Sequence, residues 1–126
     1  MKATAALVLS LVLASCAPIA PPAAPGTVDH VVLIWLKRPG NARDRQALRA
    51  AADDLRAIPG IRFLDHGTPL ASERPVVDDS FDVAFVMRFD SAAALAAYEA
   101  DPLHVRKIDE VLRPLSKKVL VYDIVR

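Results

Sequence analysis

The chain has 126 residues, with 16 Lys and Arg side chains against 15 Asp and Glu. This length suits one domain rather than two. Because the basic residues are spread along the chain, the sequence lacks the basic patch of a nucleic-acid-binding protein, and we expect no nucleic-acid partner. A single cysteine excludes a disulfide within the chain. The fold must therefore depend on packing or association.

The N-terminus has the pattern of an export signal. Lys2 precedes a short apolar run over residues 3–13, which is too short for a comfortable membrane-spanning helix. The run ends in Leu-Ala-Ser-Cys, with small residues immediately before Cys16. This tetrapeptide resembles a bacterial lipobox, in which the cysteine thiol carries the lipid. We predict a signal peptide over residues 1–15 and lipidation of Cys16; the alternative is an ordinary secretory signal with a chance cysteine.

A tether follows the predicted lipidation site. Residues 16–26 are rich in proline and alanine, a composition that favours an extended, semi-rigid spacer. Lipoproteins held at the inner membrane often carry Asp after the cysteine, whereas this chain has Ala17. We therefore expect a lipid-anchored protein of the bacterial envelope, at the outer membrane and facing the periplasm, with its domain over residues 27–126.

The first half of that domain predicts strand, helix and strand. Residues 28–36 are apolar on both faces, whereas a strand with one face in water would alternate, so we expect cover on both sides. Asn41 can cap the amphipathic helix that follows, and Pro59-Gly60 ends it. Residues 61–67 are predicted to form the second strand.

The second half predicts a loop, a strand, a helix and a last strand. In the third strand the odd-numbered residues from Phe81 to Phe89 are apolar and share one face. The second helix restarts at Asp101-Pro102, because proline suits the first helical position, and ends near Pro114. The elements are a loop over 68–80, a strand over 81–89, a helix over 92–100 and a strand over 119–125.

This β-α-β-β-α-β order predicts an α+β fold of the ferredoxin-like type, with both helices on one face of a four-stranded antiparallel sheet. The strands carry more apolar surface than a sheet with one open face should. Large exposed apolar surfaces usually mark interfaces. Two such sheets packed face to face would make a dimeric α/β barrel, so we expect a homodimer.

Several segments in order along residues 28–125 carry a family resemblance. They are Asp29–Ile34, Ile58–Ile61, Gly67, Phe81–Phe89, Val121–Ile124, and the Tyr98–His104 segment, which is similar to Tyr-x-x-His-Pro-x-His. Together they resemble the stress-responsive dimeric α/β-barrel (Dabb) family. Two positions depart from its pattern: Asp101 stands where many relatives have His, and Val83 where plant polyketide cyclases of the family have a further His.

The resemblance implies candidate site residues. Plant cyclases of the family use an acid/base pair at the positions of Tyr98 and His104, which makes these two the catalytic candidates. His30 matches the frequent first-strand histidine of the family, so His30, Tyr98 and His104 are the expected ligand-binding residues. Each also has a structural reading: Tyr98 packing its ring on the sheet, His104 serving a helix N-terminus, and His30 bonded to backbone.

Other candidates are weaker. His66 lies beside Asp65, but neighbours in a strand point to opposite faces, so we expect a solvated strand end. Three well-separated histidines without a free thiol do not make a metal site, and no glycine-rich phosphate loop is present. We expect neither a metal nor another cofactor.

Three functions remain open. The first is binding of a small apolar or aromatic molecule. The second is a cofactor-independent, polyketide-cyclase-like enzyme or lyase using His104 and Tyr98. The third is a structural lipoprotein whose barrel is filled by large side chains, namely Trp35, Phe63, Phe85, Met87 and Phe89.

Overall fold

The computed structural model describes residues 22–126. The predicted signal peptide, the lipidation site at Cys16 and most of the tether lie outside these residues. The elements are β1 (Val28–Leu36), α1 (Ala42–Leu55), β2 (Ile61–Gly67), β3 (Val83–Phe89), α2 (Ala92–Glu99), α3 (Pro102–Lys107), the π-helical turn η1 (Ile108–Leu112), α4 (Arg113–Leu115) and β4 (Ser116–Val125).

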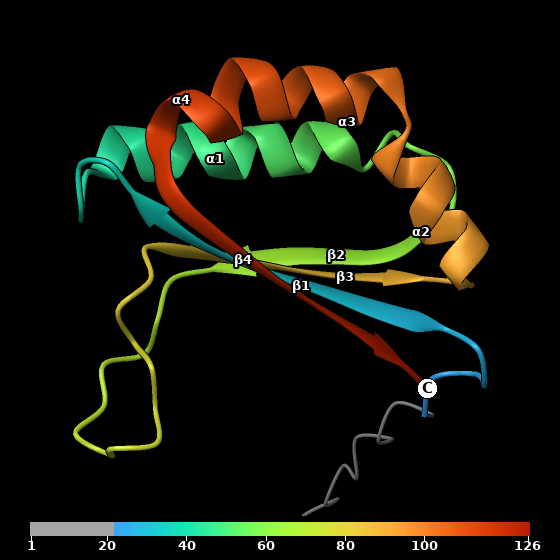
Figure 1. Cartoon of the computed structure of the whole chain (residues 1–126), viewed down its shortest axis with the longest axis horizontal. Coiled ribbons are helices and arrows are strands. Elements are labelled where there is room, and N and C mark those ends of the chain that lie inside the picture. The colour runs from blue at the N-terminus through green and yellow to red at the C-terminus, as the bar shows by residue number, and fades with distance from the viewer. Residues whose placement is uncertain (1–21) are drawn as a thin grey trace, which may run out of the picture.

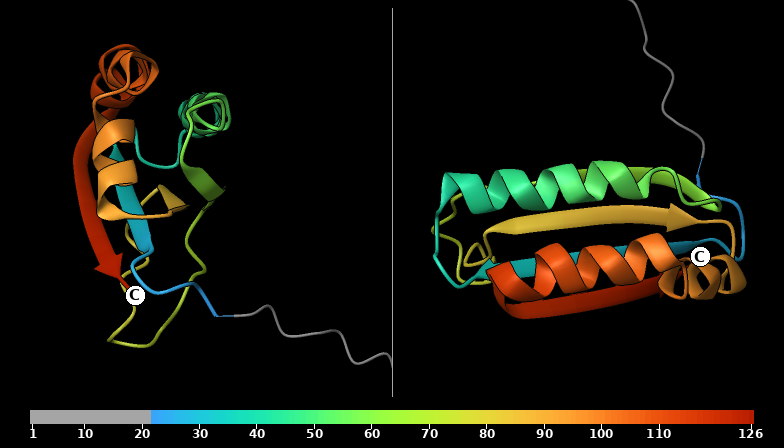
Figure 2. Two further views of the ribbon diagram at one scale, coloured as in Figure 1. Left: turned by 90° about the vertical axis from the view of Figure 1, so that its right-hand side faces the viewer. Right: turned by 90° about the horizontal axis from the view of Figure 1, so that it is seen from above.

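The strands form one antiparallel sheet in the order β2-β3-β1-β4. The helices all cover the same face of this sheet (Figure 1). Seen from above, α1 and the helix that runs from α3 to α4 lie side by side along the strands (Figure 2). The predicted ferredoxin-like α+β fold is confirmed.

The core lies between the helices and this covered sheet face. Ile34, Leu36, Val83 and Phe89 are fully buried there, and α1 contributes a stripe that includes Leu48. The core cluster is drawn from residues 28–98, and side chains as far as residue 115 pack against it. Residues 22–126 therefore carry a complete core of their own, and we expect them to fold as a unit.

The other face of the sheet, here called the open face, has no helix over it among the described residues (Figure 2). Its centre is apolar, but one end carries Asp29, whose carboxylate accepts hydrogen bonds from Arg88 and Arg126. At the other end the Lys118 ammonium lies 4.2 Å from the centre of the Trp35 ring. The apolar side chains exposed on this face are Phe63, Val86, Tyr122 and Ile124.

The third strand is shorter than predicted. It begins at Val83 rather than at residue 81, and Asp82 lies just before the strand. The Phe81 ring does not join the covered face with Val83 as expected. Instead it packs edge-on against Trp35, with ring centroids 6.4 Å apart. Asp82 in turn directs its carboxylate at the end of β1 and the turn after it.

The last strand is longer than predicted. It begins at Ser116 rather than at residue 119, because Leu36 pairs with Ser116 across a β-bulge and the Lys37 N–H donates to the Leu115 carbonyl at 2.8 Å. The preceding helix therefore continues to Leu115, one residue beyond Pro114.

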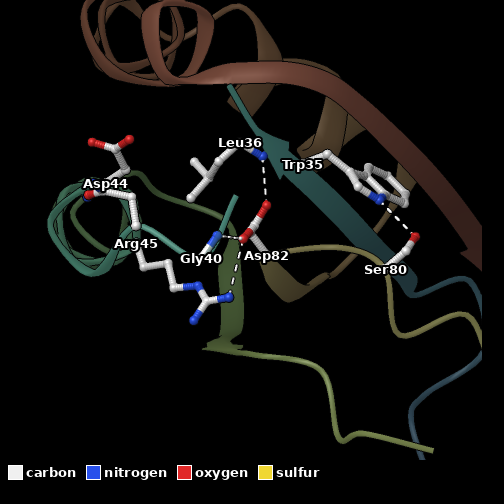
Figure 3. Close-up of polar contacts among 8 residues, drawn as sticks. Trp35, Leu36, Gly40, Asp44, Arg45, Ser80 and Asp82 are labelled. Atoms are coloured by element: carbon white, nitrogen blue, oxygen red, sulfur yellow. Dashed lines mark hydrogen bonds and ion pairs between the residues drawn. The ribbon is translucent and has the colours of Figure 1, made fainter. Parts of the chain in front are cut away.

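A buried carboxylate ties the loop before β3 to the turn after β1 (Figure 3). Asp82 accepts hydrogen bonds from the Leu36 N–H at 2.9 Å, the Gly40 N–H at 2.6 Å and the Arg45 guanidinium at 3.2 Å. Gly40 has a φ of 74°, which residues with side chains rarely adopt. Burial alone would raise the pKa of Asp82, but these donors outweigh burial and hold that pKa below its ordinary value.

Replacing this carboxylate should destabilise the domain. Asp82→Ala leaves two backbone N–H groups without their acceptor, and we expect it to lower the free energy of unfolding by about 2–4 kcal/mol. Glu73→Ala, an exposed change in the same loop, should stay within about 0.5 kcal/mol of wild type. Urea denaturation of both variants measures the difference.

The contribution of Asp82 to stability should also depend on pH. The folded-state pKa of Asp82 is depressed. The ionised carboxylate therefore stabilises the fold at pH values above its unfolded-state pKa, about 3.9, and this stabilisation is lost as pH falls through the folded-state pKa. The stability gap between wild type and Asp82→Asn should therefore shrink below about pH 4. A gap that stays constant from neutral to acidic pH would contradict this account.

Candidate functional site

A cavity of about 390 Å³ lies between the helices and the covered face of the sheet. Its floor is formed by β1, β3 and β4, and its walls by α1 and by the helix from α3 through η1. Most of the lining is apolar. The polar lining residues are His30, Tyr98, Glu99, His104, Lys107 and Asp123.

His30 and Asp123 form a side-chain pair in this cavity. Their residues face each other across the β1–β4 ladder, which brings the His30 Nδ1 to 2.6 Å from the Asp123 Oδ1. A carboxylate oxygen accepts hydrogen bonds, so the His30 Nδ1 is the donor of this pair and Nε2 is the ring nitrogen left for a ligand. The predicted backbone partner of His30 was therefore wrong: a carboxylate orients this ring.

Tyr98 reaches the cavity from α2 and is 1% exposed. Its ring centroid lies 5.0 Å from that of Phe89 and 6.1 Å from that of His30. Burial, with a smaller effect of the Glu99 charge, raises the pKa of Tyr98 above its ordinary value. The phenol therefore stays protonated near neutral pH, and it can donate a hydrogen bond to an oxygen in the cavity.

His104 stands in the first turn of α3, where the Asp101 side chain caps the helix by accepting from the Leu103 N–H at 2.8 Å. The His104 Nδ1 lies 3.0 Å from the Glu99 carbonyl oxygen. A carbonyl can only accept, so the His104 Nδ1 is the donor of this contact and Nε2 is the nitrogen left for a ligand.

The structure brings the sequence-predicted site residues together. The Tyr98 ring is near both imidazoles, with its centroid 4.3 Å from that of His104 and 6.1 Å from that of His30. This cluster offers a phenolic donor and two imidazoles whose Nδ1 is held by an oxygen. Such a set can hold a carbonyl oxygen and accept a proton next to it.

Asp123 was missed by the sequence analysis. An Asp inside an apolar last strand was a signal, because it shares the inward alternation of Val119 and Val121 and falls opposite His30 once the strands are aligned. Val83, by contrast, is fully buried in the core. The covered face of β3 therefore gives the cavity the apolar Phe85 and no second histidine.

His66 lies outside this site. Its Nε2 is 3.3 Å from the Asp53 carboxylate of α1, so the expected solvated strand end is instead a half-buried contact between β2 and α1. Lys107 pairs with Asp54 and so joins α3 to α1 beside the cavity. Within residues 22–126 no three potential ligands cluster to hold a metal ion. In the same range no helix is long and apolar enough to cross a membrane.

The family model of the stress responsive A/B barrel domain (Dabb) matches residues 28–126, which is most of the chain. The chain belongs to the Dabb family. No curated protein matches it. The covered residues include β1, with His30, and the whole segment from Tyr98 to His104.

Solved structures show the same fold. A Dabb-family protein from Mesorhizobium loti is 27% identical, with a TM-score of 0.66 over 80% of this chain and 97% of that chain. A dimeric ferredoxin-like protein of unknown function from Jannaschia sp. is 24% identical, with a TM-score of 0.64 over 80% of this chain and 100% of that chain. A hydroxynitrile lyase from Passiflora edulis is 22% identical, with a TM-score of 0.70 over 82% of this chain and 95% of that chain. The last two likenesses concern the fold alone.

Proposed function

We propose that this Dabb protein binds a small, mostly apolar or aromatic molecule with a polar oxygen at one end. The observation that carries the proposal is the cavity, whose volume of about 390 Å³ suits a small ligand. Its lining is apolar except for a few convergent polar groups, which is the usual composition of a ligand pocket.

The lining is also polarised along the strands. His30 and Asp123 form one pair of the β1–β4 ladder, and the next inward pair along it is Val32 with Val121. Farther along the strand and the helix the lining continues with Val119 and Leu112. The ligand oxygen would lie among Tyr98 and the histidines, and its apolar part along these valines and leucine.

A second candidate is a proton-transfer enzyme. The observation that favours it is the fixed Nδ1 of both histidines, which leaves a lone pair on each Nε2 if the rings are neutral. In this reading Tyr98 holds a substrate oxygen, and His104 removes a proton next to it. The Passiflora edulis protein with this fold is a hydroxynitrile lyase, so the fold can carry catalysis.

A structural role, with a barrel filled by large side chains, stays a third reading of the same fold. Trp35 and Phe63 lie on the open face, where they cannot fill the cavity. Phe85 lies against the cavity without occupying it. The cavity is open on the side of β4, where Val119 and Val121 are partly exposed, so a ligand that enters it would remove apolar surface from water.

Ligand binding should depend on the polar end and the apolar end separately. Aryl alkyl ketones of increasing chain length should raise the melting temperature of wild type until the cavity is full. Tyr98→Phe and His104→Ala should each weaken binding about 3- to 10-fold, the effect of one lost hydrogen bond. Val121→Phe should abolish the response to the longer ketones by filling the apolar end.

His66→Ala is the matched control, because it removes a histidine outside the cavity. Each variant must first match the secondary structure of wild type. In deuterated water, a proton-transfer enzyme would exchange the ketone α-protons for deuterium, and His104→Ala would abolish this exchange. That result would favour the second candidate. If no variant at the cavity changes any response that wild type shows, the pocket proposal fails.

We also propose that the protein is anchored to the outer membrane through a lipid on Cys16 and faces the periplasm. The support is the Leu-Ala-Ser-Cys sequence after a short apolar run, followed by Ala17. Mass spectrometry of the protein from the membrane fraction should find a lipidated cysteine as the first residue. Cys16→Ser should abolish this modification. An unmodified chain that starts at or after Ala17 and stays in the soluble fraction would contradict the anchor.

A homodimer completes the proposal. Proteins of this fold from Bacteroides fragilis, Thermobifida fusca and Jannaschia sp. are dimeric. The open face supplies an apolar surface for dimerisation, because exposed apolar surface is removed from water when two copies associate.

A further inference from the structure

The helix over the cavity changes its winding part-way along. In the π turn η1, the Arg113 N–H donates to the Ile108 carbonyl, five residues back rather than the four of an α-helix. The turn therefore holds one residue more than an α-helical turn would. Such turns are rare and are frequent at functional sites. Here the turn supplies two residues of the cavity lining, Ile108 at its start and Leu112 at its end.

The extra residue decides which side chain reaches the cavity. In a continuous α-helix, residues at i, i+4 and i+7 share one face, so Val111 would follow His104 and Ile108 along the lining. The π turn shifts this register by one position, or about 100° around the helix. Leu112 accordingly lines the cavity, and Val111 packs against the core cluster without lining it. Because leucine is longer than valine by one methylene, the π turn shortens the cavity here.

Pro114 gives the physical reason for the wide turn. Proline has no N–H to donate, and in an α-helix its ring clashes with the carbonyl four residues back, which is that of Glu110. The chain widens immediately before Pro114 and so avoids this clash. Two bonds then hold the end of the helix. The Lys37 ammonium donates to the Pro114 carbonyl at 2.9 Å. The Ser116 hydroxyl donates to the Leu112 carbonyl at 2.7 Å.

This wall of the cavity is loosely packed. None of residues 102–115 is buried, whereas α1, which is of similar length, buries five of its residues. A segment with few buried contacts changes conformation at a low cost in free energy. The register of this helix can therefore change while the core beneath α1 stays intact.

Leu112 stands at the end of the cavity away from the polar cluster. It follows His104 by about two helical turns, or roughly 11 Å. On the sheet, the lining runs in the same direction from Asp123 to Val119. The tail of a ligand whose oxygen meets Tyr98 would therefore reach Leu112 last.

We propose that Leu112 limits the length of the apolar chain that the cavity accepts, and that Pro114 is the positioning residue that keeps Leu112 there instead of Val111. The inference rests on the ligand-binding function proposed above. It assigns the choice of ligand length to the winding of one helical turn. The polar cluster, on other elements, sets the position of the ligand oxygen.

A series of aryl alkyl ketones tests the proposal. In wild type, each added methylene should strengthen binding about 4-fold until the chain meets Leu112, and longer chains should bind more weakly. Pro114→Ala removes the reason for the wide turn, so Val111 should replace Leu112 at the wall. The tightest-binding ketone should then be one methylene longer. Titration calorimetry on residues 22–126 measures these dissociation constants.

Alanine substitutions show which side chain meets the ligand. In wild type, Leu112→Ala should move the affinity maximum to longer ketones, whereas Val111→Ala should leave the maximum in place. In the Pro114→Ala background, Val111→Ala should move it instead. The readout is the position of the maximum, which a general loss of stability does not shift. Leu112→Ala keeps the proline, so it tests the length limit even where Pro114→Ala does not fold.

Two outcomes of these titrations would overturn the proposal. One is a Pro114→Ala protein with the same affinity maximum as wild type. The other is a wild-type maximum that moves with Val111→Ala and not with Leu112→Ala.

A crystal structure of the unliganded Pro114→Ala domain separates this inference from the proposed function. It should show a continuous α-helix over residues 102–115, with Val111 facing the cavity. A π turn that persists without the proline would overturn the role of Pro114. A wild-type protein that binds no ketone of any length would defeat the proposed function, and with it the length limit, even where the crystal structure shows the expected change of register.

Discussion

The structure depends on a sheet that is apolar on both faces but is covered by helices on only one. Burial of the covered face against α1 and the helix from α3 to α4 builds the core. The open face leaves Phe63, Val86, Tyr122 and Ile124 exposed. A surface of this kind is unfavourable in water at roughly 25 cal/mol per Å² of apolar area, which makes association the expected outcome. The protomer is in this sense half of a two-sheet structure.

Strand β4 connects this surface to the candidate site. Its side chains alternate, so that Val121 and Asp123 line the cavity while Tyr122 between them points to the open face. As an edge strand, β4 pairs with β1 alone among the described strands. Strand β4 therefore carries residues of the candidate site on one side and of the open face on the other.

Much of this was predictable from sequence. Apolar runs, the cap at Asn41, the Pro59-Gly60 break and the restart at Asp101-Pro102 predicted the element order, because these signals are local. Tyr98 and His104 were predicted as a pair from the family segment. Asp123 was missed because its role depends on the β1–β4 register, which pairs residues 93 positions apart. The late start of β3 was missed for a similar reason, since Asp82 serves donors on a distant turn.

The mass of the domain in solution tests the central claim most directly. Residues 22–126 carry the complete core, so they can be studied without the predicted lipid anchor. Light scattering after size exclusion at low micromolar protein should give twice the mass of one chain. A stable, folded monomer under these conditions would contradict the account, because it would show that the apolar open face needs no second copy.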